Sequence, residues 1–248
     1  WSQLEDKAPP IHGIHISDRG HFGVTRLTAQ KEKVPALGQV MTAKHLGIQL
    51  NQALQQHPTL SIMTPLQVDS LEQTATSVTV TLSDGQQLTS RLLVGADGQF
   101  STIRELLGLT IWQREYQQTA ITANVIPERA HQNWAYERFT EHGPLALLPM
   151  SEGRCSLVWT VKTGEERALL ASNEQQFAER LQKAFGYRLG HFEKIGQRSC
   201  YPLGLMQTNQ PVQNRVLLIG NAAHSLHPIA GQGFNLGLRD AAVLAELI

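Results

Sequence analysis

Alternating apolar and polar residues run along much of this chain and predict a protein rich in β-strands. Residues 11–17 and 22–27 alternate in this way on either side of the turn sequence SDRGH, which predicts a β-hairpin. Further strands are expected at residues 61–68, 77–82, 87–94, several times within 111–161, and at 198–205 and 215–219. The SDGQ turn joins two of them as a second hairpin.

Other segments carry apolar residues at helical spacing. They are residues 44–56, with Leu46, Leu50 and Leu54 on one face and Pro58 as terminator, and residues 174–185, with Phe177, Leu181 and Phe185 on one face. Ser101 can cap a short helix after a strand that ends near Val94, and another helix is expected to open near Gly233. Strands and helices mixed at these spacings indicate the α/β class.

Composition narrows the possible partners. Lys and Arg together number 21, as do Asp and Glu, so no excess charge favours nucleic acid or an anionic membrane. The two cysteines, Cys155 and Cys200, form no CxxC motif and are expected to be reduced thiols of a cytosolic protein. No apolar run approaches the ~20 residues of a membrane span. His224 and His227 are three apart, but Pro228 prevents a helix that would present both to a metal, so no metal site is predicted.

The segment from Arg215 to Ile248 carries the strongest local chemistry. It is expected to form a buried strand, a loop containing Gly220, Gly231 and Gly233, and then a helix. The first amides of such a helix lack intrahelical partners and favour negative charge, which suits a phosphate or the electron-rich edge of a reduced flavin. The same pattern also occurs in α/β proteins where it binds nothing.

A family resemblance rests on several motifs in a fixed order. They are ISDRGHFG, LGQV, VGADGQFSTIR, ERFTEHGPLALLPMSEGRCSLVW and HSLHPIAGQGFNLGLRD. Together they cover nearly the whole chain and resemble the ubiquinone-biosynthesis hydroxylases, a branch of the flavin-dependent aromatic hydroxylases with the p-hydroxybenzoate hydroxylase fold. The resemblance implies an incomplete Rossmann-like FAD-binding domain interleaved with an antiparallel substrate-binding sheet.

The resemblance also implies domain boundaries. Residues 36–110 and 206–248 would form the FAD-binding domain, and residues 10–35 and 111–205 the substrate domain. No GxGxxG follows a strand, and in the family that unit lies at the extreme N-terminus. The chain therefore looks like an internal fragment of a longer enzyme, and it is expected to hold FAD weakly or not at all by itself.

Site residues follow from the same motifs. The resemblance assigns cofactor binding to Gln39, Asp97, Arg104, Asn221, Pro228, Gly231, Gly233, Phe234 and Asn235. Asn221 stands where the family has an aspartate that accepts hydrogen bonds from the ribityl hydroxyls, and an amide can still accept without the charge. Structural alternatives stay open: Asp97 as part of a turn, Asn221 as a loop cap and Gln39 as polar surface. Arg138 and His142 are expected on the surface, and no catalytic residue is assigned.

The implied activity is hydroxylation of a polyprenyl (methoxy)phenol, such as 2-polyprenyl-6-methoxyphenol, through a flavin C4a-hydroperoxide. FAD, molecular oxygen and NAD(P)H would take part, and the protein would be cytoplasmic with transient contact to the inner membrane surface or to ubiquinone-pathway proteins. One alternative is a sister hydroxylase acting at another ring position. Another is a flavin-free fragment that only binds prenyl phenols or partner proteins.

Overall fold

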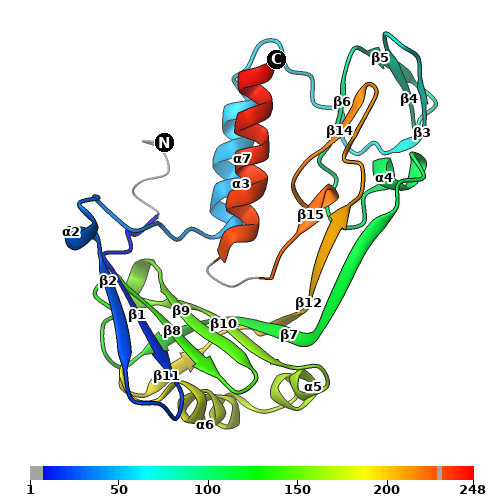
Figure 1. Cartoon of the computed structure of the whole chain (residues 1–248). Helices are drawn as coiled ribbons and strands as arrows, with labels where there is room; N and C mark the ends of the chain where they lie inside the picture. Colours follow the sequence, from blue (N-terminus) through cyan, green and yellow to red (C-terminus); the bar gives the residue numbers. More distant parts are fainter. Residues whose placement is uncertain (1–7, 228–230) are drawn as a thin grey trace. The chain divides into compact units, whose positions relative to one another are not determined.

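The computed structural model describes residues 8–227 and 231–248. The contacts divide the chain into two compact units, one of residues 1–60 and 117–202 and the other of residues 61–116 and 203–248 (Figure 1). The chain passes between the units several times, as expected for interleaved domains. Residues 36–60 group with the first unit, whereas the predicted FAD-binding domain began at residue 36. The assignment of either unit to flavin or substrate remains a prediction.

A nine-stranded sheet forms the main body of the first unit. Its order is β15-β12-β7-β10-β9-β8-β1-β2, with β11 also paired to β7. The strands are β1 (Gly13–Asp18), β2 (Val24–Thr28), β7 (Ile111–Pro127), β8 (Trp134–Thr140), β9 (Gly143–Pro149), β10 (Cys155–Lys162), β11 (Phe192–Ile195), β12 (Ser199–Thr208) and β15 (His224–Ser225). β7 and β12 continue into the second unit, which holds β15. Pairs of known register are antiparallel except β1–β8, which is parallel. The prediction of an antiparallel sheet therefore holds for all of these pairs but one.

One face of this sheet makes the core with two helices, α5 (Glu165–Leu170) and α6 (Glu174–Phe185). The predicted apolar face of α6 is confirmed, because Phe177 and Leu181 are fully buried and Phe185 is 3% exposed. Asn173 begins α6 with a capping box that includes the Gln176 side chain. Across the sheet, Leu145, Leu147 and Leu157 are fully buried against these helices.

The rest of the first unit comprises α2 (Ala29–Glu32) and α3 (Ala43–Gln55). The helix predicted at residues 44–56 is confirmed, and Thr42 caps it by accepting a hydrogen bond from the His45 amide at 3.2 Å. The hairpin predicted at residues 11–27 is also confirmed, although its second strand begins at Val24, since Phe22 lies in the exposed turn.

The second unit contains two small sheets. One has the order β3-β4-β5 and the other β13-β14-β6. The strands are β3 (Val68–Gln73), β4 (Val78–Leu82), β5 (Gln87–Ser90), β6 (Leu93–Gly95), β13 (Val212–Gln213) and β14 (Val216–Leu218). Two helices, α4 (Thr102–Leu106) and α7 (Gln232–Leu247), and the 3₁₀ turn η2 (Gly220–Ala222) complete it.

Two strand predictions in this unit are wrong. Residues 61–67 form no strand, and β3 begins at Val68, because Pro65 has a fixed φ and no N–H for a ladder. The strand predicted at 87–94 breaks after Ser90, whose hydroxyl donates to the Leu92 carbonyl at 2.9 Å. Its two halves pair in different sheets, β5 with β4 and β6 with β14.

Among the described residues, no helix is long and apolar enough to cross a membrane.

Candidate cofactor site

Two parallel strands of the second unit bring distant motifs to one sheet edge. β6 and β14 pair in parallel, with Leu93 opposite Val216 and Gly95 opposite Leu218. The segments that follow them, residues 96–101 and 219–223, therefore leave the same edge of the sheet. The crevice beyond the carboxyl ends of parallel strands is the usual ligand site in open α/β sheets.

Asp97 and Ser101 together cap helix α4. The Asp97 carboxylate accepts a hydrogen bond from the Ile103 amide at 3.1 Å, and the Ser101 hydroxyl accepts one from the Arg104 amide at 3.0 Å. The predicted Ser101 cap is therefore confirmed. Asp97 has this structural contact and is also exposed, so its carboxylate can still reach a ligand at the strand edge.

Arg104 ties the two loops together. Its guanidinium donates to the Ala222 carbonyl at 2.9 Å and to the Gln99 carbonyl at 2.6 Å. The Thr208 hydroxyl donates to the same Ala222 carbonyl at 3.0 Å. The structure thus brings together the motifs at 97–104 and 220–224, which lie more than a hundred residues apart in the sequence.

Gly220 allows η2 to lie directly against helix α7. Its φ of 57° is in the left-handed region that favours glycine. A Cβ added to Gly237 would lie 3.2 Å from the Gly220 Cα, so both glycines serve this close approach. The Asn221 side chain is exposed, whereas the next residue, Ala222, is fully buried.

Asp240 is the residue that sequence reasoning missed. Its Oδ2 accepts hydrogen bonds from the Gly220 amide at 2.9 Å and from His224 Nε2 at 2.7 Å. These contacts hold the loop after β14 onto the third turn of α7. Asp240 stands in the HSLHPIAGQGFNLGLRD motif, but nothing in the spacing indicates which backbone amide it meets.

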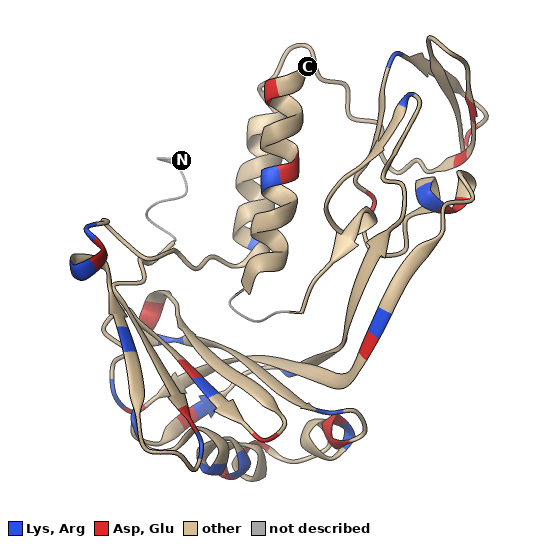
Figure 2. Ribbon diagram, in the orientation of Figure 1, with Lys and Arg blue, Asp and Glu red and all other residues tan. Residues whose placement is uncertain are grey.

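The start of α7 is open and free of acidic groups. Gly231 is the N-cap, with φ of 63° and no side-chain cap, and no acidic residue lies in the first turn. Figure 2 shows that this end of α7 carries no charged residue. Among the described residues, a Cβ on Gly231 or Gly233 would meet no atom within 4 Å, and Phe234 is 63% exposed beside the exposed Asn235. Pro228 lies outside the described residues.

Gln39 lies in the first unit, in a bridge with Pro10. The backbone around it is held by hydrogen bonds from the Ile11 amide to the Gly38 carbonyl at 2.8 Å and from the Val40 amide to the Pro9 carbonyl at 3.4 Å. Its side chain is half-buried and makes no hydrogen bond with the residues that the structure describes.

The histidines near η2 have protein partners. His224 pairs with Asp240, and the His227 ring meets the Tyr116 ring edge to face, with centroids 5.2 Å apart. Burial lowers the pKa of His227 below its ordinary value. Within the described part of the chain, no three His, Cys, Asp or Glu side chains are grouped as metal ligands.

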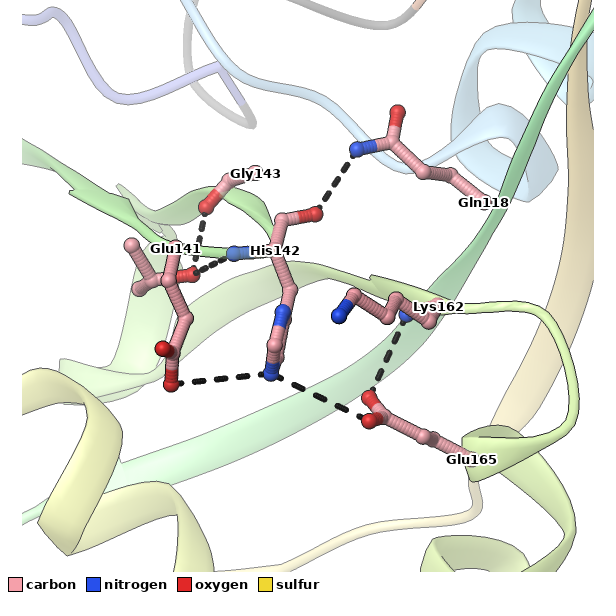
Figure 3. A network of polar contacts seen from close by, with 7 residues as sticks. Gln118, Glu141, His142, Gly143, Lys162 and Glu165 are labelled. Carbon is pink, nitrogen blue, oxygen red and sulfur yellow. Dashed lines mark hydrogen bonds and ion pairs between the residues drawn. The ribbon is translucent and has the colours of Figure 1, made fainter.

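Arg138 and His142 are half-buried, which corrects the prediction that both lie on the surface. Arg138 donates to the Phe185 carbonyl at 2.7 Å. In Figure 3, the His142 ring lies between Glu141 and Glu165, with Nε2–Oε1 distances of 3.6 and 3.8 Å, and Gln118 donates to the His142 carbonyl at 2.8 Å. The polar contacts hold the turn between β8 and β9, which is a structural role.

Comparison with known proteins places this architecture in a family. The family described as the FAD binding domain matches residues 1–248. Ubiquinone hydroxylase UbiL of Rhodospirillum rubrum is 39% identical over 251 residues, covering 99% of this chain and 57% of the relative. The 3-demethoxyubiquinol 3-hydroxylase of Escherichia coli is 32% identical over 220 residues, covering 89% of this chain and 56% of the relative. The chain thus spans somewhat more than half the length of these relatives.

Solved structures share the fold. PqsL of Pseudomonas aeruginosa, in complex with 2-aminobenzoylacetate, matches with a TM-score of 0.82 at 22% identity, over 99% of this chain and 69% of that one. HpxO of Klebsiella pneumoniae, complexed with FAD and uric acid, matches with a TM-score of 0.73 at 21% identity, over 98% of this chain and 64% of that one. The chain belongs to the FAD-binding-domain family.

Proposed function

We propose that the protein carrying this chain is an FAD-dependent monooxygenase that hydroxylates a polyprenyl (methoxy)phenol in ubiquinone biosynthesis. The observation that carries the proposal is the open, glycine-lined start of α7, anchored to the edge where β6 and β14 end. The names of the sequence relatives supply the reaction and the pathway.

The described residues fit a flat, electron-rich ring at this place. Packing among the described residues does not require glycine at position 233, since a Cβ there would meet none of their atoms within 4 Å. A ligand lying against the backbone would explain the glycine. The uncapped start of α7, without acidic side chains, favours the negative charge that a reduced flavin carries.

Each predicted site residue then has a role. The amides of Gly233, Phe234 and Asn235 would face the pyrimidine edge of the flavin, with Pro228 and Gly231 shaping the loop before them. Asn221 would accept from a ribityl hydroxyl, and Gln39 would reach the ribityl-phosphate region. Asp97 and Arg104 would hold the pyrophosphate region through the loops that they already fix.

FAD, when bound, supplies the redox chemistry and the activation of oxygen, with NAD(P)H proposed as the electron donor. The protein's own task is to orient the ring, stabilise its negative charge and exclude water from the reacting atoms. Residues 36–110 and 206–248 are proposed as the FAD-binding part and residues 10–35 and 111–205 as the substrate part.

For the substrate, we propose 2-polyprenyl-6-methoxyphenol, because the ERFTEHGPLALLPM segment resembles that of 2-octaprenyl-6-methoxyphenol hydroxylase. A prenyl tail requires access to lipid, so we place the protein in the cytoplasm with transient contact to the inner membrane surface. Contact with other proteins of the ubiquinone pathway would serve the same transfer.

Hydroxylation under labelled oxygen tests this function. The protein is incubated with FAD, NADPH or NADH, ¹⁸O₂ and 2-allyl-6-methoxyphenol, a short analogue of the proposed substrate. We expect a product carrying one ¹⁸O atom, whose NMR spectrum identifies the hydroxylated ring position and so separates the sister hydroxylases. NAD(P)H oxidation that yields only hydrogen peroxide, or no oxidation with any of several phenols, would contradict the proposal.

A further inference from the structure

The face of the large sheet that points away from α5 and α6 carries a carboxylate in unusual surroundings. Strand register places Glu137 of β8 beside Ile16 of β1 and Ala146 of β9, and Ala146 beside Val158 of β10. The next position along this row is Thr122 of β7. Alternation along each strand puts the row on the opposite face from Tyr136, Leu147 and Leu157, which pack in the helix-covered core.

This second face is apolar yet incompletely covered. Seven of its side chains are half-buried, while the small residues Ala120, Ala135 and Thr160 on the same face are buried. The half-buried members are Ile14, Ile16, Glu137, Ala146, Leu148, Val158 and Thr122. Phe139, two residues beyond Glu137 on the same face, is 38% exposed. Such a face fits a flat apolar ring.

Glu137 has no partner among the described residues. No hydrogen bond or ion pair involves its side chain, and Arg138, its neighbour in sequence, points to the other face and donates to Phe185. Asp18 and Lys162 share the face at the ends of β1 and β10, and Lys162 lies four residues from Val158, or ~13 Å along the strand. Desolvation by burial raises the pKa of Glu137, and this strengthens the carboxylate as a proton acceptor.

We propose that Glu137 accepts the hydrogen bond of the substrate's phenol hydroxyl while the aromatic ring lies on the apolar row around it. This inference rests on the proposed function and names the group that recognises its substrate. A neutral phenol supplies the one donor that the lone carboxylate needs. An aromatic acid would bind this face poorly. Its carboxylate would lie beside the Glu137 carboxylate, and no residue of the row carries a positive charge to offset the repulsion. A hydrogen bond to this acceptor would also draw the hydroxyl proton away from the ring oxygen and make the ring more electron-rich.

A matched pair of ligands tests the inference. 2-Allyl-6-methoxyphenol and its methyl ether differ only in the hydroxyl donor. Binding to the wild-type protein, to Glu137→Gln and to Glu137→Ala is measured by NMR titration, with Glu193→Gln as the control, since Glu193 is an exposed glutamate of β11. Far-UV circular dichroism checks that each variant is folded.

We expect the wild type and Glu193→Gln to bind the phenol at least about tenfold more tightly than the ether, which is the lower end of what a hydrogen bond to a charged group contributes. In Glu137→Ala the two ligands should bind equally, while affinity for the ether changes less than twofold. In Glu137→Gln the preference should shrink, because the amide accepts without charge.

An unchanged preference in Glu137→Ala would overturn the role of Glu137 and leave the proposed function standing. A wild-type protein that binds the ether and the phenol alike would do the same. If the wild type binds neither ligand at millimolar concentration, both the inference and the proposed substrate class fail.

Discussion

Removing the Asp240 carboxylate should loosen the loop that joins β14 to α7. In Asp240→Ala, the Gly220 amide and His224 Nε2 both lose the acceptor that they reach at 2.9 and 2.7 Å. Hydrogen bonds to a charged acceptor contribute roughly 1.5–3 kcal/mol each, and partial exposure reduces this, because the His224 and Asp240 side chains are 22% and 26% exposed. We therefore expect a loss of about 2 kcal/mol.

Hydrogen exchange measures this loss locally. A loss of about 2 kcal/mol corresponds to about 30-fold lower protection of the Gly220 amide. Asp240→Asn should lose less, since its amide oxygen can still accept, and FAD affinity should fall in the same order. Asp69→Asn is the control, because Asp69 is an exposed carboxylate of β3 that makes no hydrogen bond to the described residues. Wild-type protection of Gly220 in Asp240→Ala would refute the reasoning.

Three further outcomes follow from the structure. Burial raises the pKa of Cys155 to about 12, so at pH 8 a thiol reagent should label only the exposed Cys200 in the native protein and both thiols after unfolding; two native thiols would contradict this. Asn173→Ala should cost about 1 kcal/mol of stability in urea unfolding by removing the α6 cap, Asn173→Asp should restore most of it, and equal midpoints would refute the cap. Gly143→Ala should destabilise by more than ~1 kcal/mol, because φ is 126° and the new Cβ would lie 2.7 Å from a threonine methyl of β10. Gly153→Ala, with φ of 69° and open space, should cost less, and a reversed order of melting temperatures would contradict this steric account.

The elements predicted best are those whose signal is local. The α6 helix follows from Phe177, Leu181 and Phe185 on one face, and the α4 start follows from the Ser101 hydroxyl. The ends of the strands depended on features that the alternation of apolar and polar residues does not show. For example, β3 begins only at Val68, after Pro65. The parallel β1–β8 pair joins strands more than a hundred residues apart, and no local pattern specifies such a partner.

In the candidate site, too, residues within sequence motifs were predictable, whereas contacts that depend on packing were not. The sequence motifs locate Asp97, Arg104 and Asn221, and the structure brings their loops together through the Arg104 contact with Ala222. Asp240 escaped prediction because its contact with Gly220 depends on how α7 packs against η2. The orientation of Glu137 likewise depends on register across several strands, although alternation within β8 already separates it from Tyr136.

The flavin content of Gly233→Val tests the central claim most directly. Among the described residues a Cβ at Gly233 would meet nothing within 4 Å, and the same holds at Gly47 of helix α3, where Gly47→Val is the control. The protein carrying this chain is purified in each form, titrated with FAD and followed by flavin fluorescence and absorbance. We predict that the wild type and Gly47→Val bind FAD and that Gly233→Val does not, since a branched side chain would occupy the space of the ring. Equal flavin binding by Gly233→Val and the wild type would contradict the placement of the cofactor at the start of α7.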